Sequence, residues 1–520
     1  MRVLVALLLL SLGFVQGGTF PDYEALRRKA QRLWDDVTAS DYVILLQKES
    51  GLRDSAELLA KHRRAEIVEF SPEAPELVLP TLIRKGARFV AVFVEPGQMD
   101  VNLVRRMIVI STLLDEDPFC DFALGFFTAS SPARVKEFVA RAIRADLTGV
   151  KPYALQLSMS NISHCYRDSS FVPGMPGDSW YVKTGDVEYA AKALKDLSRA
   201  GFIHLGGCAD PEGIWMFDDK RNLDSSKHWP FDPEKVGHDP QGEMPRITAS
   251  DFAELDLGGA VVWTHACHIG SVSRIWVEGD IVSTFGRCNK VEEYRIPAGR
   301  SVGLAIIEAG ASAYIAPLGP NHGGQAAIEK TIASETGACL GDVMRRAYHD
   351  IVMDTEGHPE RIGVYVTGKP ARWDPDDYIN YNSPQHRALY GDPLMRPFGK
   401  HHSPPSVTIS ATASGRDLEL EFEVMKTGYQ GRTLYGNRRM RGAGRIYEVI
   451  PLEGHPRSVT VGKVKGLLAD GNEFAITRTT ALLERIDGET FLHLQLVTDD
   501  REALRTKGSR VSVEVRFRGK

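Results

Sequence analysis

The chain has 520 residues, which is too long for one ordinary hydrophobic core, so two or three packed units are expected. Hydrophobic residues make up 43% of the chain and charged residues 25%, the balance of a folded protein rather than a disordered one. The formal net charge of −5 is small for this length and comes without a basic field or a long block of like charges, which argues against nucleic acid as a partner.

The N-terminus has the pattern of a secretory signal peptide, which we assign to residues 1–18. Arg2 precedes an apolar run at residues 3–15, and small residues follow that run. The run is too short for a comfortable membrane span, although a retained signal anchor is an alternative. No later segment is apolar for long enough to cross a bilayer. We therefore expect a soluble, secreted or periplasmic protein with no transmembrane segment.

The next part of the chain, residues 19–150, alternates strand and helix patterns. Short apolar runs predict buried strands at residues 41–47, 65–70 and 88–96. Amphipathic stretches predict helices at residues 54–64, 75–86 and 132–147. Strands separated by helices of this length are typical of βαβ units with a mainly parallel sheet.

A second α/β unit is expected at residues 151–395, where the same alternation continues. The patterns predict strands at residues 201–207, 258–267 and 311–319. They predict helices at residues 187–200, 249–257, 301–310 and 336–353. The right-handed crossover rule then leaves few topologies besides a doubly wound sheet with helices on both faces.

The C-terminal part, residues 396–520, has a different pattern. Residues 373–405 are rich in Pro, Asn, His, Tyr and Asp and are interpreted as a linker. After them, short runs alternate between apolar and polar residues with period two, as in DLELEFEVM and RVSVEVRFRG. This alternation, interrupted by turn residues, predicts an antiparallel β-sandwich.

Two predicted strand ends in the second unit carry reactive side chains. Residues 202–213 read FIHLGGCADPEG, and residues 261–271 read VVWTHACHIGS. Open α/β sheets bind ligands at the carboxyl ends of their strands, so we expect both segments at one rim. Cys267 ends the second strand and is followed by Gly270. A thiol in such a junction can approach a carbonyl while nearby backbone N–H groups stabilise the oxyanion.

A family resemblance becomes specific at these residues. DFAELDLGGAVVWTHACHIGS, residues 251–271, resembles the segment by which gingipains and related caspase-clan cysteine peptidases present their nucleophile. SVGLAIIEAGASAYIAPLGP resembles the helix and strand that follow it, and LLDEDPFCDFALGFFTASSPARVKEFVARA resembles the N-terminal gingipain subdomain. The resemblance implies two doubly wound caspase-like and gingipain-like α/β subdomains, followed by an all-β, Ig-like sandwich. It also implies hydrolysis of a protein or peptide substrate through a Cys267 acyl-enzyme.

The sequence departs from the family at the general base. The family has a His-Gly pair at the end of the preceding strand, and Cys208 and Ala209 stand at those positions here. His204 could serve as the base, although it lies roughly 13 Å from residue 208 along a straight strand. His265 or His268, beside the nucleophile, could substitute for it. Without a base, the protein would be a pseudopeptidase that binds a peptide or glycan.

Other interpretations of the same rim stay open. Cys208 and Cys267 could form a disulfide in an oxidising compartment. Backbone N–H groups at Gly206, Gly207 and Gly270 are candidates for the oxyanion site. A zinc site is a further alternative, because imidazole and thiol ligands converge here, and its candidate ligands are His204, Cys208, His265, Cys267 and His268.

A few features outside the rim have two interpretations each. Hard oxygen ligands cluster in one loop and could bind calcium or cap turns: Asp115, Asp117 and Asp121. Aromatic residues in an insertion could line a substrate groove or cover the sheet edge: Trp215, Phe217, Trp229 and Phe231. His322 is expected near the same crevice, and Asn161 begins an N-glycosylation pattern.

Overall fold

A computed structural model describes most of the chain from Asp41 onward. The described residues are 41–158, 175–181, 187–215, 246–278, 291–319, 329–330, 332–334, 336–354, 357, 387–398, 405–414, 417–425, 444–486, 488–500 and 503–518. The predicted signal peptide, Asn161, His322 and the aromatic residues Phe217, Trp229 and Phe231 lie outside them, as do the side chains of Cys208 and Trp215. The chain divides between residues 404 and 405 into two compact units.

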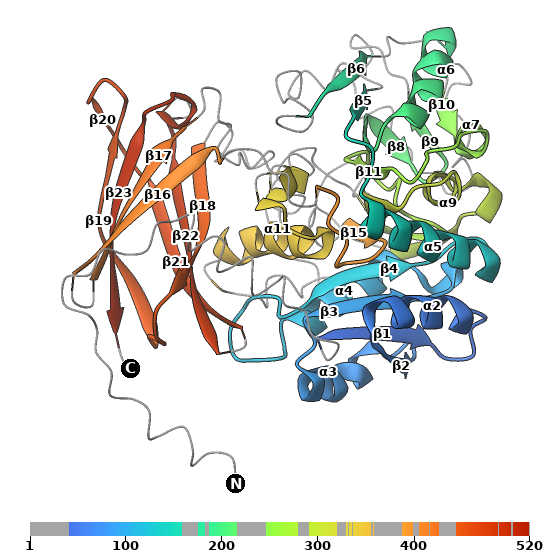
Figure 1. Ribbon diagram of the computed structural model, residues 1–520, viewed down its shortest axis with the longest axis horizontal. Helices are drawn as coiled ribbons and strands as arrows, with labels where there is room; N and C mark the ends of the chain where they lie inside the picture. The colour runs from blue at the N-terminus through green and yellow to red at the C-terminus, as the bar shows by residue number, and fades with distance from the viewer. Residues whose placement is uncertain are drawn as a thin grey trace. The chain divides into compact units, whose positions relative to one another are not determined.

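The α/β unit is built on one ten-stranded sheet, in the order β2-β1-β3-β4-β15-β14-β11-β7-β5-β6 (Figure 1). Its first half consists of β1 (Tyr42–Gln47), β2 (Glu66–Phe70), β3 (Phe89–Phe93), β4 (Ala123–Phe127) and β15 (Arg387–Tyr390). Its second half consists of β5 (Ala154–Ser158), β6 (Gly177–Tyr181), β7 (Phe202–Gly206), β11 (Val261–Thr264) and β14 (Ala313–Pro317). Strands are parallel within each half, and the antiparallel pair β14–β15 joins the halves. The two α/β parts therefore share one sheet, where two doubly wound subdomains were expected.

Strand β15 corrects the interpretation of residues 373–405 as a linker. Its four residues read RALY and are all buried between β4 and β14. Met395 and Phe398, just beyond it, pack in the core of the same unit. So short a strand, followed by Gly391, carries too little periodicity to be recognised in a Pro-rich and Asn-rich segment.

Helices cover both faces of this sheet. They are α2 (Arg53–Arg63), α3 (Leu79–Lys85), α4 (Val101–Ser111), α5 (Pro132–Thr148), α6 (Val187–Asp196), α7 (Ala249–Ala253), α9 (Val302–Glu308) and α11 (Leu340–Asp354). Helix α5 packs against α2 and α9, whereas α4 and α11 both pack on β4 from the other face. Side chains begin several of these helices: Asp100 Oδ1 accepts the Leu103 N–H at 2.8 Å to cap α4, and a Thr248–Asp251 capping box starts α7.

The α/β unit also contains two smaller sheets, formed by segments that follow β7 and β11 in the sequence. β8 (Cys208–Asp210), β9 (Gly213–Trp215) and β10 (Arg246–Thr248) form a three-stranded antiparallel sheet, and β12 (Arg274–Glu278) pairs with β13 (Val291–Arg295). The chain leaves the main sheet at Gly207, whose φ of 151° is a conformation that favours glycine. Cys208 therefore does not continue β7 as a straight strand, as the 13 Å estimate had assumed.

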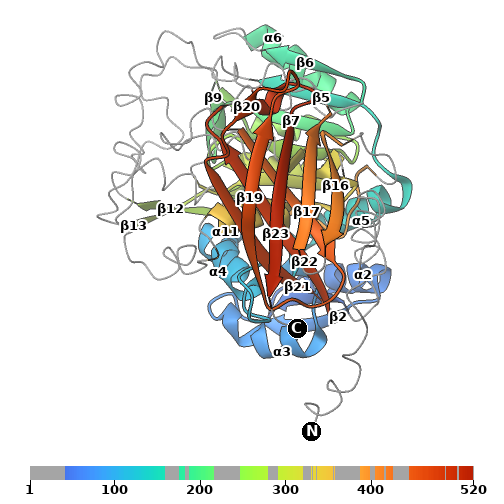
Figure 2. The same cartoon turned by 90° about the vertical axis from the view of Figure 1, so that its left-hand side faces the viewer.

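The C-terminal unit is an antiparallel sandwich, as the period-two pattern predicts. Figure 2 shows the broad face of its five-stranded sheet, β16-β17-β23-β19-β20. The strands are β16 (Val407–Ser414), β17 (Asp417–Val424), β18 (Gly444–Leu452), β19 (Ser458–Leu467), β20 (Glu473–Phe474), β21 (Arg478–Ile486), β22 (Glu489–Thr498) and β23 (Arg510–Arg518). A three-stranded sheet, β18-β22-β21, completes the sandwich. Alternate residues such as Leu420 and Val513 form its own hydrophobic core.

Candidate active site

Cys267 lies in the turn that follows β11, at the carboxyl end of the second half of the sheet. The sequence predicts a strand to residue 267, but β11 ends at Thr264 because the Thr264 Oγ1 accepts the Ala266 N–H at 3.1 Å. His268 then adopts a left-handed conformation with φ of 58°. The thiol therefore sits on a turn rather than on a pleated strand.

Hydrogen bonds hold this turn, residues 265–270, against β14 and β15. The His268 N–H donates to Gly319 O at 3.0 Å, and the Gly270 N–H donates to Pro317 O at 2.8 Å. The Tyr390 hydroxyl donates to Gly270 O at 2.5 Å. Gly270 is thus a packing position whose N–H is already engaged, which does not fit the expected oxyanion donor. Gly206 and Gly207 stay candidates at the end of β7.

Cys267 differs from the other thiols that the structure describes. Cys120 and Cys339 are buried, whereas Cys267 is partly exposed. Burial, reinforced by the Asp342 charge, raises the pKa of the Cys339 thiol to about 12. Cys267 is a thiol in this structure, and the side chain of Cys208, its partner in the alternative disulfide, lies outside the described residues. Cys267 is therefore the described cysteine with access to a reactant.

Two predicted site histidines meet behind this turn. His204 on β7 and His265 after β11 are brought together by the parallel pairing of the two strands, in which Trp263 lies beside His204. His204 Nε2 and His265 Nδ1 form a 2.9 Å hydrogen bond. Both residues are buried, with exposed fractions of 1% for His204 and 9% for His265. The ends of the strands in residues 202–213 and 261–271 therefore lie at one rim of the sheet, as the sequence predicts.

A lysine completes this group of side chains. Lys330 Nζ lies 3.0 Å from His204 Nδ1, and Lys330 is also buried. His204 is therefore engaged at both ring nitrogens, to Lys330 on one side and to His265 on the other. This arrangement does not fit His204 as the direct base for Cys267, and it leaves His265 and His268, both within two residues of Cys267, as the candidates.

Burial determines the protonation of these groups. It lowers the pKa of His265 to about 3 and that of His268 to about 4, and the Lys330 charge adds to the effect at His265. Burial, with the Lys330 charge, also holds the pKa of His204 well below its usual range. The pKa of Lys330 falls to about 7 by burial, opposed by the Glu329 charge. Both imidazoles of the pair are neutral at pH 7, while Lys330 titrates near it.

A buried ion pair lies next to this group. Arg387 on β15 makes two 2.7 Å hydrogen bonds to the Glu329 carboxylate, and both side chains are fully buried. The Arg387 guanidinium also donates a third hydrogen bond, at 2.8 Å, to the Thr264 carbonyl oxygen at the end of β11. The pair thus fixes the strand end from which the Cys267 turn begins.

Sequence patterns gave no specific signal for Glu329, Lys330 and Arg387. Glu329 and Lys330 are adjacent charged residues in a helix-like segment, and such pairs usually face solvent. Arg387 starts β15, which lies in the segment that the sequence predicts as a linker. Only the burial of all three distinguishes them from ordinary surface charges.

Two groups of side chains have the residue types of a metal site: those of the rim and those of the aspartate loop. The described side chains of the rim form no metal-ligand cluster, because the two ring nitrogens of His204 bond directly to His265 and to Lys330. Asp115, Asp117 and Asp121 do have carboxylate oxygens within 4.8 Å of one another. Each also caps a turn: the Asp117, Phe119 and Leu114 N–H groups donate to Asp115, Asp117 and Asp121 at 2.8, 2.9 and 2.9 Å. Turn capping is the interpretation that these contacts fit, and calcium binding stays the untested alternative.

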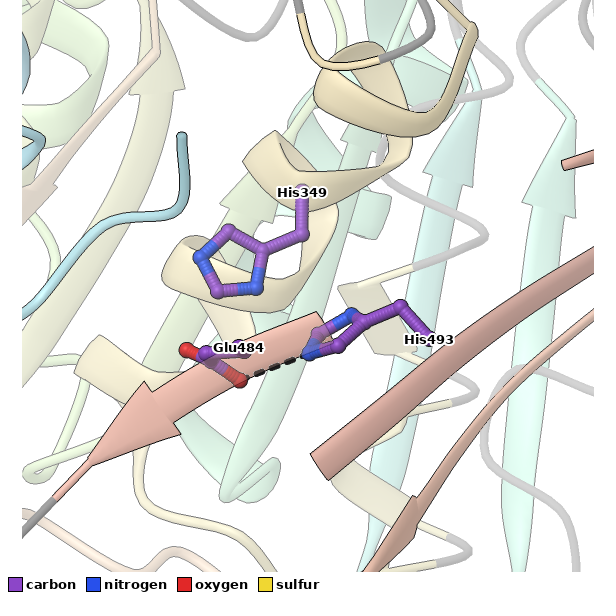
Figure 3. Close-up of side chains that lie close together, drawn as sticks. All are labelled: His349, Glu484 and His493. Carbon is purple, nitrogen blue, oxygen red and sulfur yellow. Dashed lines mark hydrogen bonds and ion pairs between the residues drawn. The ribbon is translucent and has the colours of Figure 1, made fainter. Parts of the chain in front are cut away.

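Other buried histidines are engaged within their own units. In the sandwich, His493 Nε2 lies 2.6 Å from Glu484 Oε2 (Figure 3), and Tyr447 Oη lies 2.6 Å from His493 Nδ1. This chain of polar groups joins β18, β22 and β21. In the α/β unit, His349 Nε2 accepts the Cys120 N–H at 2.9 Å, which fixes α11 to the loop before β4. These contacts stabilise the fold.

Comparisons with known proteins give partial likenesses. No protein-family model matches the chain, and no curated protein sequence is similar to it. Among solved structures, the Arg-specific cysteine proteinase gingipain R aligns at 12% identity and a TM-score of 0.42, over 89% of this chain and 96% of that one. A complex of the RgpB pro- and mature domains from Porphyromonas gingivalis aligns at 11% identity and a TM-score of 0.41, over 88% and 97% of the two chains. A structure described as a protease aligns at 9% identity and a TM-score of 0.41, over 92% and 98%. Identities and TM-scores this low transfer no residue role.

None of the helices in the described part of the chain is long and apolar enough to span a bilayer.

Proposed function

We propose that the protein is an exported cysteine-type hydrolase that cleaves peptide bonds, with Cys267 as nucleophile and His265 as the group that takes its proton. The observation that carries the proposal is the position of Cys267. Its thiol is partly exposed in a strand-end turn, two residues after His265, which forms a buried hydrogen bond with His204. The resemblance of residues 251–271 to the gingipain nucleophile segment supports it.

The chemistry follows from these groups. The Cys267 thiolate attacks the carbonyl carbon of a peptide bond, and the amine leaves to give a thioester acyl-enzyme. Water then hydrolyses the thioester and regenerates the thiol. Backbone N–H groups near Gly206, Gly207 and Cys267 would stabilise the oxyanion of both tetrahedral intermediates.

An acyloxymethyl-ketone probe tests the proposal on the full chain at neutral pH. We expect rapid covalent labelling that is abolished in Cys267→Ala and retained in Cys339→Ala, because Cys339 is a buried thiol with a raised pKa. Labelling of Cys339 or Cys120 in the folded protein, or no labelling of Cys267, would contradict the proposal.

One observation favours a second function, that of a non-catalytic binding protein. The lowered pKa values of His265 and His268 mean that neither imidazole holds a proton at neutral pH, so no standing thiolate–imidazolium pair forms with them. The rim would then bind a peptide or glycan without cutting it. Cys208→His restores the family's base, and peptidase activity in that variant but not in the parent protein would favour this function.

A further inference from the structure

Three buried side chains form a continuous hydrogen-bonded chain behind the Cys267 turn. Lys330 Nζ contacts His204 Nδ1 at 3.0 Å, and His204 Nε2 contacts His265 Nδ1 at 2.9 Å. Their residues are 3%, 1% and 9% exposed. His265 Nε2 is the ring nitrogen at the end of this chain that does not face His204. The chain therefore runs from a titratable amine to His265, which lies two residues before the nucleophile in the sequence.

The charge of Lys330 sets the direction of both hydrogen bonds. An ammonium group can only donate, so His204 Nδ1 must accept and the proton of neutral His204 must lie on Nε2. His204 then donates to His265 Nδ1. Neutral His265 carries its own proton on Nε2 and cannot accept another one there.

A neutral Lys330 allows the opposite direction. The amine has a lone pair and can accept a proton from His204 Nδ1, so His204 Nε2 becomes the acceptor for the Nδ1–H of His265. His265 Nε2 is then an unprotonated base. The same three residues thus have two tautomeric states, and only the state with neutral Lys330 can take a proton from a thiol.

The surrounding charges favour Lys330 as the final holder of the proton. Burial, together with the charges of Lys330 and Arg387, lowers the pKa of both imidazoles, so a proton cannot rest on either one near pH 7. Glu329 is the opposite charge that acts on Lys330, whose pKa is about 7. The amine is the member of the chain whose titration matches neutral pH.

We propose that Lys330 and His204 are positioning residues of a proton relay that controls the basicity of His265 and the reactivity of Cys267. The inference rests on the proposed function. One proton moves at each step: from the Cys267 thiol to His265 Nε2, from His265 Nδ1 to His204 Nε2, and from His204 Nδ1 to the Lys330 amine. A neutral thiol and a neutral amine become a thiolate and an ammonium ion, and both histidines end neutral with their tautomers reversed.

The pH dependence of Cys267 alkylation by iodoacetamide tests the relay in the full chain. We expect the rate in the wild-type protein to rise with an apparent pKa at or below about 7, the value of Lys330. Lys330→Met cannot accept the proton, so its apparent pKa should move toward the value of about 8.5 of an ordinary thiol, and its rate at pH 7 should fall about tenfold. An unchanged profile in Lys330→Met overturns the relay.

Two further variants separate proton acceptance from charge and from packing. Lys330→Arg keeps the positive charge but cannot release a proton, so we expect it to lose the inflection near pH 7 as Lys330→Met does. A wild-type profile in Lys330→Arg would mean that Lys330 acts only as a fixed charge, which overturns the relay. Lys136→Met, at an exposed lysine of α5, is the matched control and should keep the wild-type profile.

Nitrogen NMR of the histidine-labelled protein reports the relay independently of the thiol. The ring-nitrogen shifts of His204 and His265, assigned from His204→Gln and His265→Gln spectra, should exchange tautomer as Lys330 titrates and should lose this exchange in Lys330→Met. Fixed tautomers in a protein with a reactive Cys267 would overturn the relay and leave the proposed function standing. Tautomer exchange with an unreactive Cys267 would support the relay and contradict the proposed function.

Discussion

Glu329 and Arg387 show how much a single buried charge matters at this rim. Their side chains are fully buried, and the guanidinium also holds the Thr264 carbonyl. Glu329→Gln would leave Arg387 charged, buried and without its carboxylate. We expect a loss of about 3–5 kcal/mol in the free energy of unfolding, measured by chemical denaturation.

The control for this prediction is an exposed ion pair of the same unit. Lys136 and Asp54 lie 3.4 Å apart with side chains that are 55% and 78% exposed. Solvent screens such a pair, so Asp54→Asn should change the free energy of unfolding by less than about 1 kcal/mol. Equal effects of the two substitutions would mean that Glu329 and Arg387 do not depend on each other.

His268 predicts a specific acid sensitivity. Burial lowers its pKa to about 4 in the folded protein, below the value of about 6.5 in the unfolded chain. Between these pH values the unfolded chain binds a proton that the folded protein does not, so stability is full above about pH 6.5 and falls as the pH drops to 4. The loss should be about 3 kcal/mol at 1.36 kcal/mol per pKa unit.

His268→Asn should remove this contribution. Asparagine tolerates the left-handed conformation of residue 268, where φ is 58°, and it does not titrate. The free energy of unfolding of the variant, measured from pH 7 to pH 4, should fall less steeply than that of the wild-type protein. Parallel curves for the two proteins would show that His268 does not titrate on unfolding.

Among the elements, helix α9 sets the position of the nucleophile turn. A Cβ added at Gly303 would lie 2.9 Å from the Ile269 carbonyl oxygen, which belongs to that turn. Gly303→Ala should displace the turn, reduce Cys267 alkylation and lower the free energy of unfolding by about 1–3 kcal/mol. Gly299→Ala, where no atom lies within 4 Å of the added Cβ, is the matched control. Normal Cys267 reactivity in Gly303→Ala would show that α9 does not position the thiol.

Elements with strong periodicity were predictable from the sequence, and elements defined by long-range contacts were not. The strand at residues 41–47 and the helix at 132–147 coincide closely with β1 and α5, because their apolar spacing is continuous over the whole element. The helix at 75–86 begins as a 3₁₀ turn before α3. β15 could not be found, since a four-residue strand acquires its identity from its neighbours β4 and β14.

The candidate site was predictable to a similar degree. The sequence indicates that His204 and His265 approach one rim, because parallel strands end at the same edge of a sheet. It does not indicate that the two imidazoles bond to each other, because the strand end at Thr264 and the kink at Gly207 depend on local backbone conformation. Nor does it select Lys330, whose role depends on burial by segments far away in the chain.

At the scale of the whole α/β unit, β4 lies beside β15, the strand whose antiparallel pairing with β14 joins the two halves of the sheet. A Cβ added at Gly125 of β4 would lie 2.3 Å from the Gly391 carbonyl oxygen and 2.8 Å from Pro393 Cδ, so these backbones must move apart. Because the halves share one sheet, Gly125→Ala should reduce amide protection in both of them, at β3 and at β11 alike. We expect a loss of about 3 kcal/mol in the free energy of unfolding.

Hydrogen exchange followed by mass spectrometry measures this directly in the full chain. Strands β17 and β23 of the sandwich serve as internal controls, because they belong to the separate C-terminal unit with its own core. Gly97→Ala, with open space around the added Cβ, is the control variant and should leave every strand protected. If β3 lost protection while β11 kept it, the halves would unfold independently, and the sheet could not transmit order from one half to the rim that carries Cys267.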